Sequence, residues 1–337
     1  MAAAQPASLT QFVTPLAAGA YVTSAAFLDG TPVLALGDGT LLLAQTGGTK
    51  TLEAHPGAAI LNGACNHSVL VTGGDDGRVV LTDAAGQMSL AGHEKGRWID
   101  AIALRADGAI AWAAGKTVRA RDAKGEIKTW EAAFGVRGLA FFAKGYRLAA
   151  AHYNGVSLWF PNAAAMPEKL EWKGSHLDVT VSPDGRMVVS SMQENNLHGW
   201  RLDDRKDMRM SGYPAKTRST SWSGDGDWLA TSGADACIVW PFQGKDGPMG
   251  KKPRECGLRE SRISRVAFHP RTLVVAMGYE DGWVLLCRLT DAAELLVRAR
   301  REGDSTAAIS ALAWSADGSR LVFGTVDGEA GVLHLPK

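Results

Sequence analysis

The sequence predicts an all-β protein built from repeated antiparallel units. Similar segments recur at a spacing of roughly 36 to 46 residues along the 337-residue chain. Within each segment, apolar and polar residues alternate with a period of two, and Gly/Asp turns separate the alternating runs. Alanine-rich stretches do not sustain the i, i+3, i+4, i+7 apolar stripe of a helix. A period of this length is typical of four-stranded blades, so we expect a closed β-propeller.

The repeat occurs eight times, over about residues 17–335. Each unit consists of an alternating strand, a turn such as Pro183-Asp184-Gly185, an apolar strand, a second turn such as Asp76-Gly77, and a third strand. The units begin at Val22, Ala59, Ile99, Val136, Leu177, Thr217, Ile263 and Ile309.

The two ends of the chain are predicted to meet. The last unit ends after its third strand at Leu335, and the segment from Ser8 to Leu16 is expected to supply the missing outer strand. We therefore expect one domain over residues 1–337, with residues 1–16 as a closing strand. Eight four-stranded blades are predicted, with seven as the alternative if one unit is misread.

The units resemble WD40 repeats over nearly the whole chain. The residues that carry the resemblance are Ser182-Pro-Asp-Gly185, Gly92-His93, the terminal aspartates Asp83 and Asp122, and Trp159, Trp200 and Trp240 at the ends of third strands. The resemblance implies a His–Ser/Thr–Asp–Trp hydrogen-bond tetrad in each blade, and no repeat carries it completely. The second repeat has His55, Thr72 and Asp76, but Thr82 stands in the Trp place.

Composition narrows the classes of partner. The 36 Lys+Arg and 35 Asp+Glu residues give a net charge of +1, so no overall field attracts nucleic acid or a membrane surface. No segment is long and apolar enough to cross a bilayer. The four cysteines form no CxxC pair, and the first residues lack the basic region of a signal peptide. We expect a cytoplasmic protein that is monomeric by itself.

No catalytic or metal-binding pattern is present in the sequence. The eight histidines are spread mostly one to a repeat, without HxH, HxxxH or HxxE spacing. His55, His93 and His176 precede first strands, where the WD40 resemblance implies a structural role. We therefore predict no catalytic residues, no metal, no cofactor and no enzymatic activity.

The predicted function is a scaffold that binds a protein or peptide partner of unknown identity through the top face of the propeller. The resemblance implies contact positions at the start of each first strand and before each second turn. Trp, Tyr and Arg, which dominate interface hot spots, are frequent among them. The alternative is an enzyme or small-ligand binder that uses the central channel. The candidate protein-binding residues are Tyr21, Trp98, Asp100, Arg137, Tyr153, Leu177, Lys216, Arg218, Arg262 and Glu280.

Overall fold

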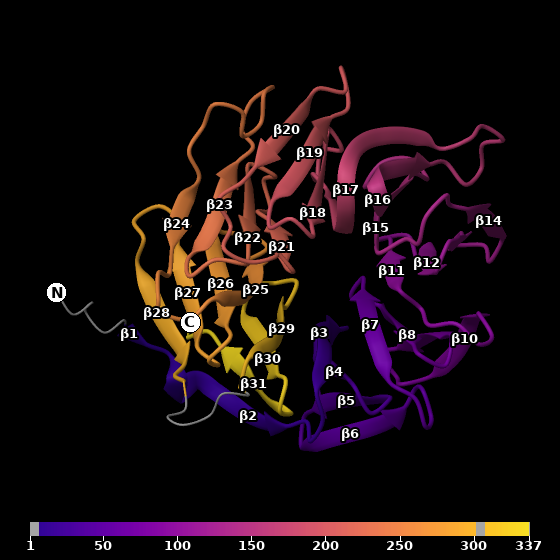
Figure 1. Ribbon diagram of the computed structural model, residues 1–337. Helices are drawn as coiled ribbons and strands as arrows, with labels where there is room; N and C mark the ends of the chain where they lie inside the picture. The colour runs from indigo at the N-terminus through magenta and orange to yellow at the C-terminus, as the bar shows by residue number, and fades with distance from the viewer. Residues whose placement is uncertain (1–6, 301–306, 337) are drawn as a thin grey trace. The chain divides into compact units, whose positions relative to one another are not determined.

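The structure is a computed structural model that describes residues 7–300 and 307–336. The described residues form β-strands joined by turns and loops, with one short 3-10 helix, η1 (Thr10–Phe12) (Figure 1). The chain divides into two compact units. Unit 1 comprises residues 1–34, 43–48 and 218–337, and unit 2 comprises residues 35–42 and 49–217.

Unit 2 contains three complete sheets of described strands. The sheet of the second repeat contains β7 (Ile60–Cys65), β8 (Val69–Gly74), β9 (Arg78–Asp83) and β10 (Met88–His93). The sheet of the third repeat contains β11 (Ala101–Leu104), β12 (Ile110–Ala114), β13 (Thr117–Arg121) and β14 (Ile127–Glu131). A six-stranded sheet contains β15 (Gly138–Phe141), β16 (Leu148–Trp159), β17 (Glu168–Val181), β18 (Met187–Met192), β19 (Leu197–Arg201) and β20 (Asp207–Met210).

Unit 1 likewise contains three complete sheets of described strands. The first contains β21 (Thr220–Trp222), β22 (Trp228–Thr231), β23 (Cys237–Pro241) and β24 (Arg254–Cys256). The second contains β1 (Ala7–Ser8), β25 (Ile263–Phe268), β26 (Val274–Tyr279), β27 (Val284–Arg288) and β28 (Glu294–Arg298). The third contains β2 (Val13–Ala17), β29 (Ile309–Trp314), β30 (Arg320–Thr325) and β31 (Glu329–His334).

The remaining sheet belongs to the first repeat, and its residues are divided between the two units. It contains β3 (Val22–Leu28), β4 (Thr31–Leu36), β5 (Thr40–Gln45) and β6 (Gly48–Glu53).

The described strands thus form seven hydrogen-bonded sheets, which is the alternative number, and not eight separate ones. The difference arises in the six-stranded sheet, where the fourth and fifth sequence units share β17. Residues 168–171 of β17 pair with β16, whereas residues 178–181 pair with β18. Within β16, residues 148–151 pair with β15 and residues 155–158 pair with β17. One continuous strand therefore joins two sequence units into a single sheet.

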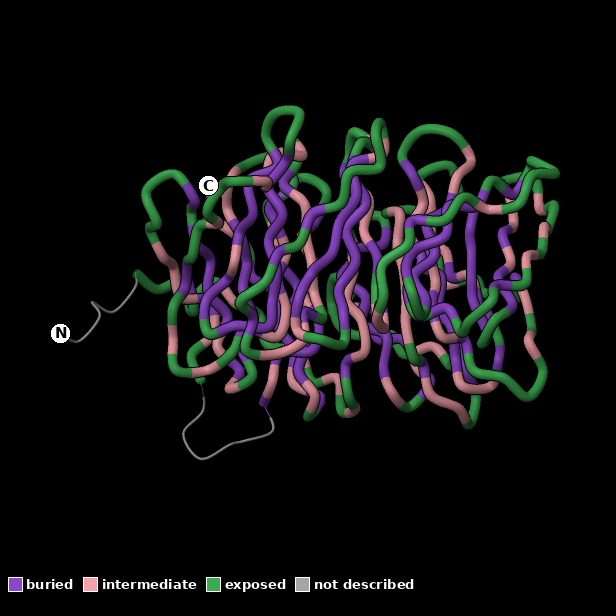
Figure 2. The backbone as a smooth tube through the Cα atoms, turned by 45° about the horizontal axis from the view of Figure 1, so that its top comes forward, coloured by how far each residue is buried: buried purple, intermediate pink, exposed green. Residues whose placement is uncertain are grey.

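The hydrophobic core lies between neighbouring sheets within each unit. Buried residues follow the strands and exposed residues follow the connecting loops, as Figure 2 shows. In unit 2, the cluster between the third and fourth repeats is built from alanines packed around Trp159, with Trp130 and Phe141 at its margin. Alanine is a poor strand former by itself, so packing decides the structure of these stretches. Strands, not helices, form there, as the sequence pattern predicts.

The turns between second and third strands need glycine for two reasons. Gly39 has a φ of +90°, a conformation that side chains rarely adopt. A Cβ at this position would also lie 2.2 Å from the carbonyl oxygen of His55. Gly77 has a φ of +76° and meets the carbonyl oxygen of Glu94 in the same way. The Asp-Gly turns predicted from the sequence therefore pack directly against the loop that leads into the next repeat.

A serine–aspartate pair recurs in the turns between first and second strands. Ser182 Oγ donates to Asp184 Oδ1 at 2.6 Å and accepts the N–H of Met187 at 2.9 Å. Ser315 Oγ donates to Asp317 Oδ1 at the same distance. Each pair closes its hairpin by satisfying backbone and side-chain groups together.

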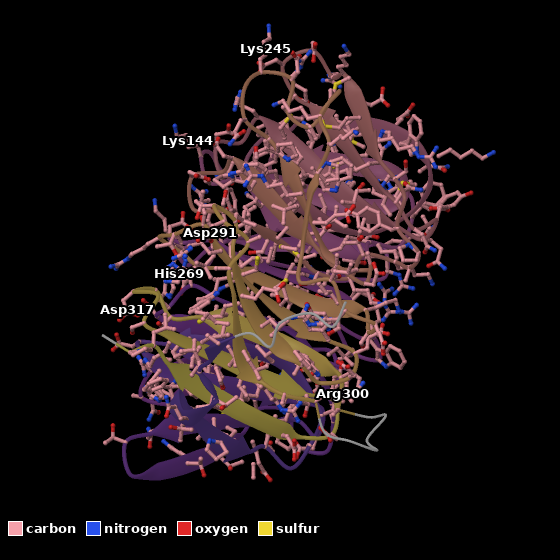
Figure 3. The ribbon with its side chains drawn as sticks, turned by 90° about the vertical axis from the view of Figure 1, so that its left-hand side faces the viewer. Lys144, Lys245, His269, Asp291, Arg300 and Asp317 are labelled. Atoms are coloured by element: carbon pink, nitrogen blue, oxygen red, sulfur yellow. The ribbon has the colours of Figure 1, made fainter. Side chains whose placement is uncertain are left out.

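His269 occupies the serine place in the seventh repeat. Its Nδ1 accepts the backbone N–H groups of Arg271 and Thr272, both at 3.1 Å. Its Nε2 therefore carries the proton and donates to the carbonyl oxygen of Gly318 at 3.1 Å, in the corresponding turn of the eighth repeat. His269 and Asp317 lie at the same end of unit 1, and Arg300 lies at the other (Figure 3). This histidine links two neighbouring sheets.

The N-terminal segment completes the sheet of the last repeat, as the sequence predicts. β2 pairs antiparallel with β31, so that Leu16 lies opposite Ala330. β1 also pairs in parallel with β28, the outer strand of the preceding sheet. Between these strands, Leu9 is buried in the core of unit 1. The segment therefore binds two successive sheets; residues 1–6 of the predicted closing strand lie outside the described residues.

The second repeat assembles three members of the polar tetrad. His55 is fully buried, with Nδ1 3.0 Å from Asp76 Oδ1 and Nε2 3.0 Å from Thr72 Oγ1. Thr82, in the place of the tryptophan, is also fully buried, and its Oγ1 has no hydrogen-bond partner. The tetrad is partial in this repeat, as predicted, because Thr82 cannot reach the network.

Of the other two predicted structural histidines, one is buried and one is not. His176 is fully buried, and its Nδ1 lies 2.7 Å from Ser190 Oγ. His93 is exposed. In its place the neighbouring Glu94 accepts a hydrogen bond of 2.9 Å from Trp112 Nε1. The structural role implied for His93 is therefore wrong, because a carboxylate satisfies the buried indole instead.

Candidate functional site

The ten predicted binding residues are divided between the two units. Six belong to unit 2 and are Trp98, Asp100, Arg137, Tyr153, Leu177 and Lys216. Four belong to unit 1 and are Tyr21, Arg218, Arg262 and Glu280.

Trp98 is the most exposed aromatic residue described in the structure. It lies in the loop that leads to β11, and 66% of its surface is exposed. The next residue, Ile99, is fully buried in the core between the second and third repeats. Alternation along the chain predicts this arrangement, because successive residues of an extended segment point to opposite sides. The indole is therefore displayed to solvent from a well-anchored position.

Asp100 and Arg137 form an ion pair between neighbouring repeats. Asp100 Oδ1 accepts a hydrogen bond of 3.2 Å from Arg137 Nη1, and Oδ2 accepts one of 2.6 Å from the N–H of Gly115. The Arg137 side chain remains 63% exposed. The pair fixes the orientation of both side chains and neutralises the carboxylate, and Arg137 still has donors that point to solvent.

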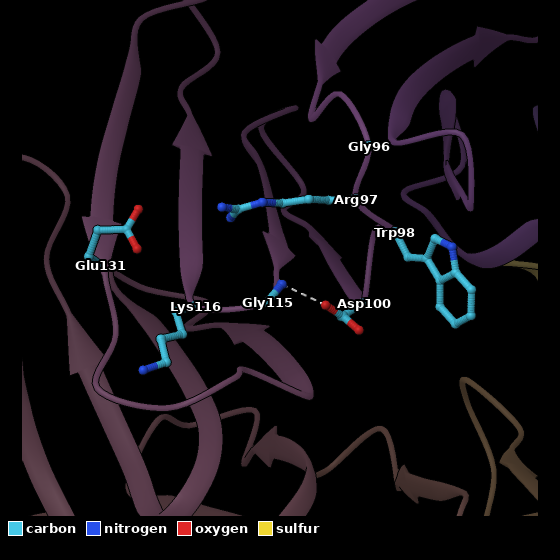
Figure 4. Close-up of a pocket in the computed structure, with 7 residues that line it drawn as sticks. All are labelled: Gly96, Arg97, Trp98, Asp100, Gly115, Lys116 and Glu131. Atoms are coloured by element: carbon cyan, nitrogen blue, oxygen red, sulfur yellow. Dashed lines mark hydrogen bonds between the residues drawn. The ribbon is translucent and has the colours of Figure 1, made fainter.

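A pocket of about 590 Å³ opens beside Trp98. Figure 4 shows the indole on one side of the pocket and Arg97, Lys116 and Glu131 on the other. Arg97 Nη1 donates to Thr117 Oγ1 at 3.0 Å and to the carbonyl oxygen of Ala114 at 3.4 Å, so its guanidinium is held in place. The pocket thus combines a large apolar wall with charges of both signs. It is lined by Gly96, Arg97, Trp98, Asp100, Gly115, Lys116 and Glu131.

Tyr153 forms an exposed aromatic pair with Phe134. The two ring centroids are 5.4 Å apart and the rings are nearly perpendicular, at 74°. Both side chains stay partly accessible, at 46% for Tyr153 and 40% for Phe134. Tyr153 therefore contributes to packing and to the surface together. Leu177 and Lys216 are half-buried.

The four predicted residues of unit 1 include a second ion pair. Arg262 Nη2 lies 3.0 Å from Glu280 Oε2, and both side chains are about half exposed. Tyr21 and Arg218 are exposed as well. As in unit 2, an arginine at the start of one repeat binds a carboxylate held by the same or a neighbouring repeat.

Burial shifts the pKa values of His198 and Asp178, two titratable groups of unit 2. Burial lowers the pKa of His198 to about 4, against a smaller opposing effect of Asp207. Although Asp178 is exposed, desolvation of its carboxyl by surrounding protein atoms raises its pKa to about 6, and a hydrogen bond from the N–H of Val179 opposes the shift. Within residues 7–300 and 307–336, no three His, Cys, Asp or Glu side chains gather in a way that suits a metal ion. The described helical residues are also too few to span a membrane.

Comparison with known proteins identifies the fold. Residues 261–337 match a family model described as the anaphase-promoting complex subunit 4 WD40 domain. The chain has the fold of a WD40-type β-propeller. Among solved structures, a crystal structure of the computationally designed Ika8 protein matches with a TM-score of 0.76 and 19% identity. That match covers 95% of this chain and 98% of the designed one, and at this identity it shows the fold alone. No curated protein matches the sequence.

Sequence reasoning missed several surface residues of this WD40-type propeller. Arg97, Lys116 and Phe134 lie within one or two residues of positions that the resemblance implied, in the same loops. The sequence indicated which loops would carry surface contacts. It did not indicate which side chains of each loop face solvent, because the family pattern fixes only the position of the loop. Arg265 of β25 was missed for another reason: Ser264 forms a β-bulge there, and an extra residue reverses the alternation that follows it.

Proposed function

We propose that this WD40-type propeller is a non-catalytic scaffold that binds a protein or peptide partner through the loops that display Trp98. The observation that carries the proposal is the exposed indole beside a pocket with charges of both signs. A rigid aromatic side chain offers a large contact area with little entropy to lose, which is why tryptophan dominates interface hot spots.

Two further observations support this proposal. The Asp100–Arg137 pair and the bonds of Arg97 hold polar groups in place around the indole, so little ordering is needed when a partner binds. The matching family model is also named after a subunit of a complex, so the protein it describes acts within an assembly. We further propose that the protein is cytoplasmic, which the four free cysteines support.

The test compares Trp98→Ala with Met166→Ala. Met166 is a suitable control because it is an apolar residue of the same unit, 81% exposed and in the loop between β16 and β17. The tagged protein is used to recover partners from its native host, and the affinity of a stoichiometric partner is then measured by calorimetry. Trp98→Ala should weaken binding by about 1 to 3 kcal/mol, whereas Met166→Ala should have little effect.

A melting curve for each variant completes the experiment. Trp98→Ala is expected to leave the melting temperature nearly unchanged, because the side chain is mostly exposed. Unchanged affinity, or a sharp drop in melting temperature with normal binding by the folded fraction, would refute the role of Trp98.

A further inference from the structure

Four successive first strands of unit 1 lie side by side and begin at the same end. Ser219 Oγ accepts the N–H of Val266 at 3.0 Å, which joins β21 to β25. Ser264 Oγ donates to the carbonyl oxygen of Ile309 at 2.6 Å, which joins β25 to β29. Ser310 Oγ donates to the carbonyl oxygen of Val22 at 2.6 Å, which joins β29 to β3. Residues at the starts of these strands are therefore neighbours.

Arg265 holds a partly buried positive charge among these strands. Its Nε donates to the carbonyl oxygen of Ser310 at 2.6 Å, and Nη1 donates to that of Ser264 at 3.0 Å. Both acceptors are neutral, and no described carboxylate lies within ion-pair distance of the guanidinium. A guanidinium has five N–H donors, so three of them remain available on a group that is fixed in position.

Hydrogen bonds place Arg218 and Tyr21 close to Arg265 through their neighbours in the chain: Ser219, next to Arg218, binds Val266, and Ser310 binds both Arg265 and Val22, next to Tyr21. Burial lowers the pKa of Arg265, Tyr21 opposes this shift, and the nearby charge of Arg218 adds to it by a smaller amount. Arg218 is exposed, and its side chain makes no ion pair with a described residue. Two arginines therefore lie at the starts of neighbouring strands with no described carboxylate within ion-pair distance of either, an arrangement that favours an anion between them.

Three other arginines near the starts and ends of strands in unit 1 are neutralised by carboxylates. Arg262 pairs with Glu280, Arg259 lies 2.5 Å from Glu294, and Arg298 lies 2.7 Å from Glu329. Arg254 and Arg320 have no described carboxylate within ion-pair distance either, but each guanidinium lies over an aromatic ring, that of Trp228 or of Phe27. Arg218 and Arg265 have neither kind of partner among the described residues.

We propose that Arg218 and Arg265, with the Tyr21 hydroxyl, form a carboxylate-binding site for an acidic segment of a protein partner. The proposal rests on the proposed function, since it names the chemistry of the partner. Guanidinium groups bind carboxylates through paired, charge-assisted hydrogen bonds, and Arg265 needs no reorganisation to do so. A bound carboxylate would also compensate the partly buried charge of Arg265.

The test is a calorimetric titration of the full chain with hexaglutamate, with hexaglutamine as the uncharged comparison, at constant ionic strength. The variants are Arg218→Ala and Arg265→Lys, with Arg271→Ala as the control. Arg271 is an exposed cation of the same unit that follows His269 in a turn outside the site. We expect hexaglutamate to bind, and each site variant to weaken binding by about tenfold or more, while Arg271→Ala binds normally.

Arg265→Lys keeps the positive charge but removes the planar fork, so it separates a built site from general attraction. Equal binding by wild type and both site variants would overturn the proposal. An equal loss of hexaglutamate affinity in Arg271→Ala and in the site variants would also overturn it. Binding of hexaglutamine as tight as that of hexaglutamate would do the same. Tight binding of a twelve-residue oligothymidylate without binding of hexaglutamate would assign the arginines to phosphates and overturn it as well.

Failure here can be told apart from failure of the proposed function. Trp98 belongs to unit 2 and acts through apolar contact, so Trp98→Ala should bind hexaglutamate as wild type does. Loss of the protein partner in Trp98→Ala, with no hexaglutamate binding by any variant, would retain the scaffold and reject the carboxylate site.

Discussion

Replacing His198 by phenylalanine should remove much of the acid sensitivity of folding in unit 2. The His198 ring is fully buried, stacked on Trp172 with centroids 3.8 Å apart and edge-on to Trp200 at 4.8 Å. Neither ring nitrogen makes a hydrogen bond, although Nε2 lies 3.4 Å from Asp207 Oδ2. The imidazole therefore behaves as an aromatic packing group, and phenylalanine preserves that role.

The magnitude follows from the lowered pKa. Burial holds the pKa of His198 at about 4 in the folded chain, below its usual value of 6.5. As pH falls, His198 therefore binds a proton in the unfolded chain before it does so in the folded chain. Its contribution to the free energy of unfolding is complete above pH 6.5 and is lost as pH falls towards 4. At pH 5 the loss relative to pH 8 is about 2 kcal/mol from this group.

The assay is urea unfolding at pH 8 and pH 5, followed by tryptophan fluorescence. His198→Phe should lose about 2 kcal/mol less than wild type between the two pH values. His334→Gln is the control, because His334 is exposed and its removal should leave the wild-type profile unchanged. If His198→Phe shows the same pH dependence as wild type, the inferred burial of a neutral imidazole is wrong.

Three more predictions concern single features of the fold. The pKa of Asp178 is raised to about 6 in the folded chain. The contribution of its neutral carboxyl to the free energy of unfolding is therefore complete below about pH 4 and is lost as pH rises through 6. Asp178→Asn should therefore raise the melting temperature at pH 7.5 but not at pH 4, and equal shifts at both pH values would contradict this. Deleting residues 1–17 removes β1 and β2 and exposes the edges of β28 and β31, so calorimetry should show a lower melting temperature and light scattering should show aggregation. If the truncated chain keeps its melting temperature and stays monomeric, the N-terminal segment does not stabilise these two sheets. Thr82→Val should be neutral or stabilising by about 1 kcal/mol in chemical unfolding, because the Thr82 hydroxyl is buried without a partner. Thr72→Val should instead destabilise by about 1 to 3 kcal/mol, because Thr72 binds His55; the reverse order would show that the partial tetrad does not stabilise the blade.

Local patterns in the sequence predicted the local structure well. Period-two alternation placed Ile99 inside and Trp98 outside, and Asp-Gly dipeptides marked turns such as that of Gly39. The N-terminal strand followed from counting, because a blade with three strands needs a fourth. These features depend on neighbouring residues or on the repeat itself, which a single sequence contains.

Features that depend on geometry between repeats were not predictable. The Asp100–Arg137 pair joins residues 37 positions apart, and its existence depends on the distance between two first strands. The direction of the Arg265 side chain depends on the β-bulge at Ser264, and no residue type in the sequence predicts that bulge. The number of sheets depends on whether β17 continues through the end of one unit or breaks there.

The attachment of the N-terminal segment also imposes an order of events on folding. β2 (Val13–Ala17) is synthesised long before its partner β31 (Glu329–His334). On the ribosome β2 therefore stays without its antiparallel partner until β31 is made, and contacts of such long sequence separation form slowly. Pro15 lies in the middle of β2 and cannot donate to a ladder, which makes this waiting strand a poor template for another chain. Pro15, which weakens β2 as a pairing partner, thus protects the nascent chain from pairing with other chains until β31 is made.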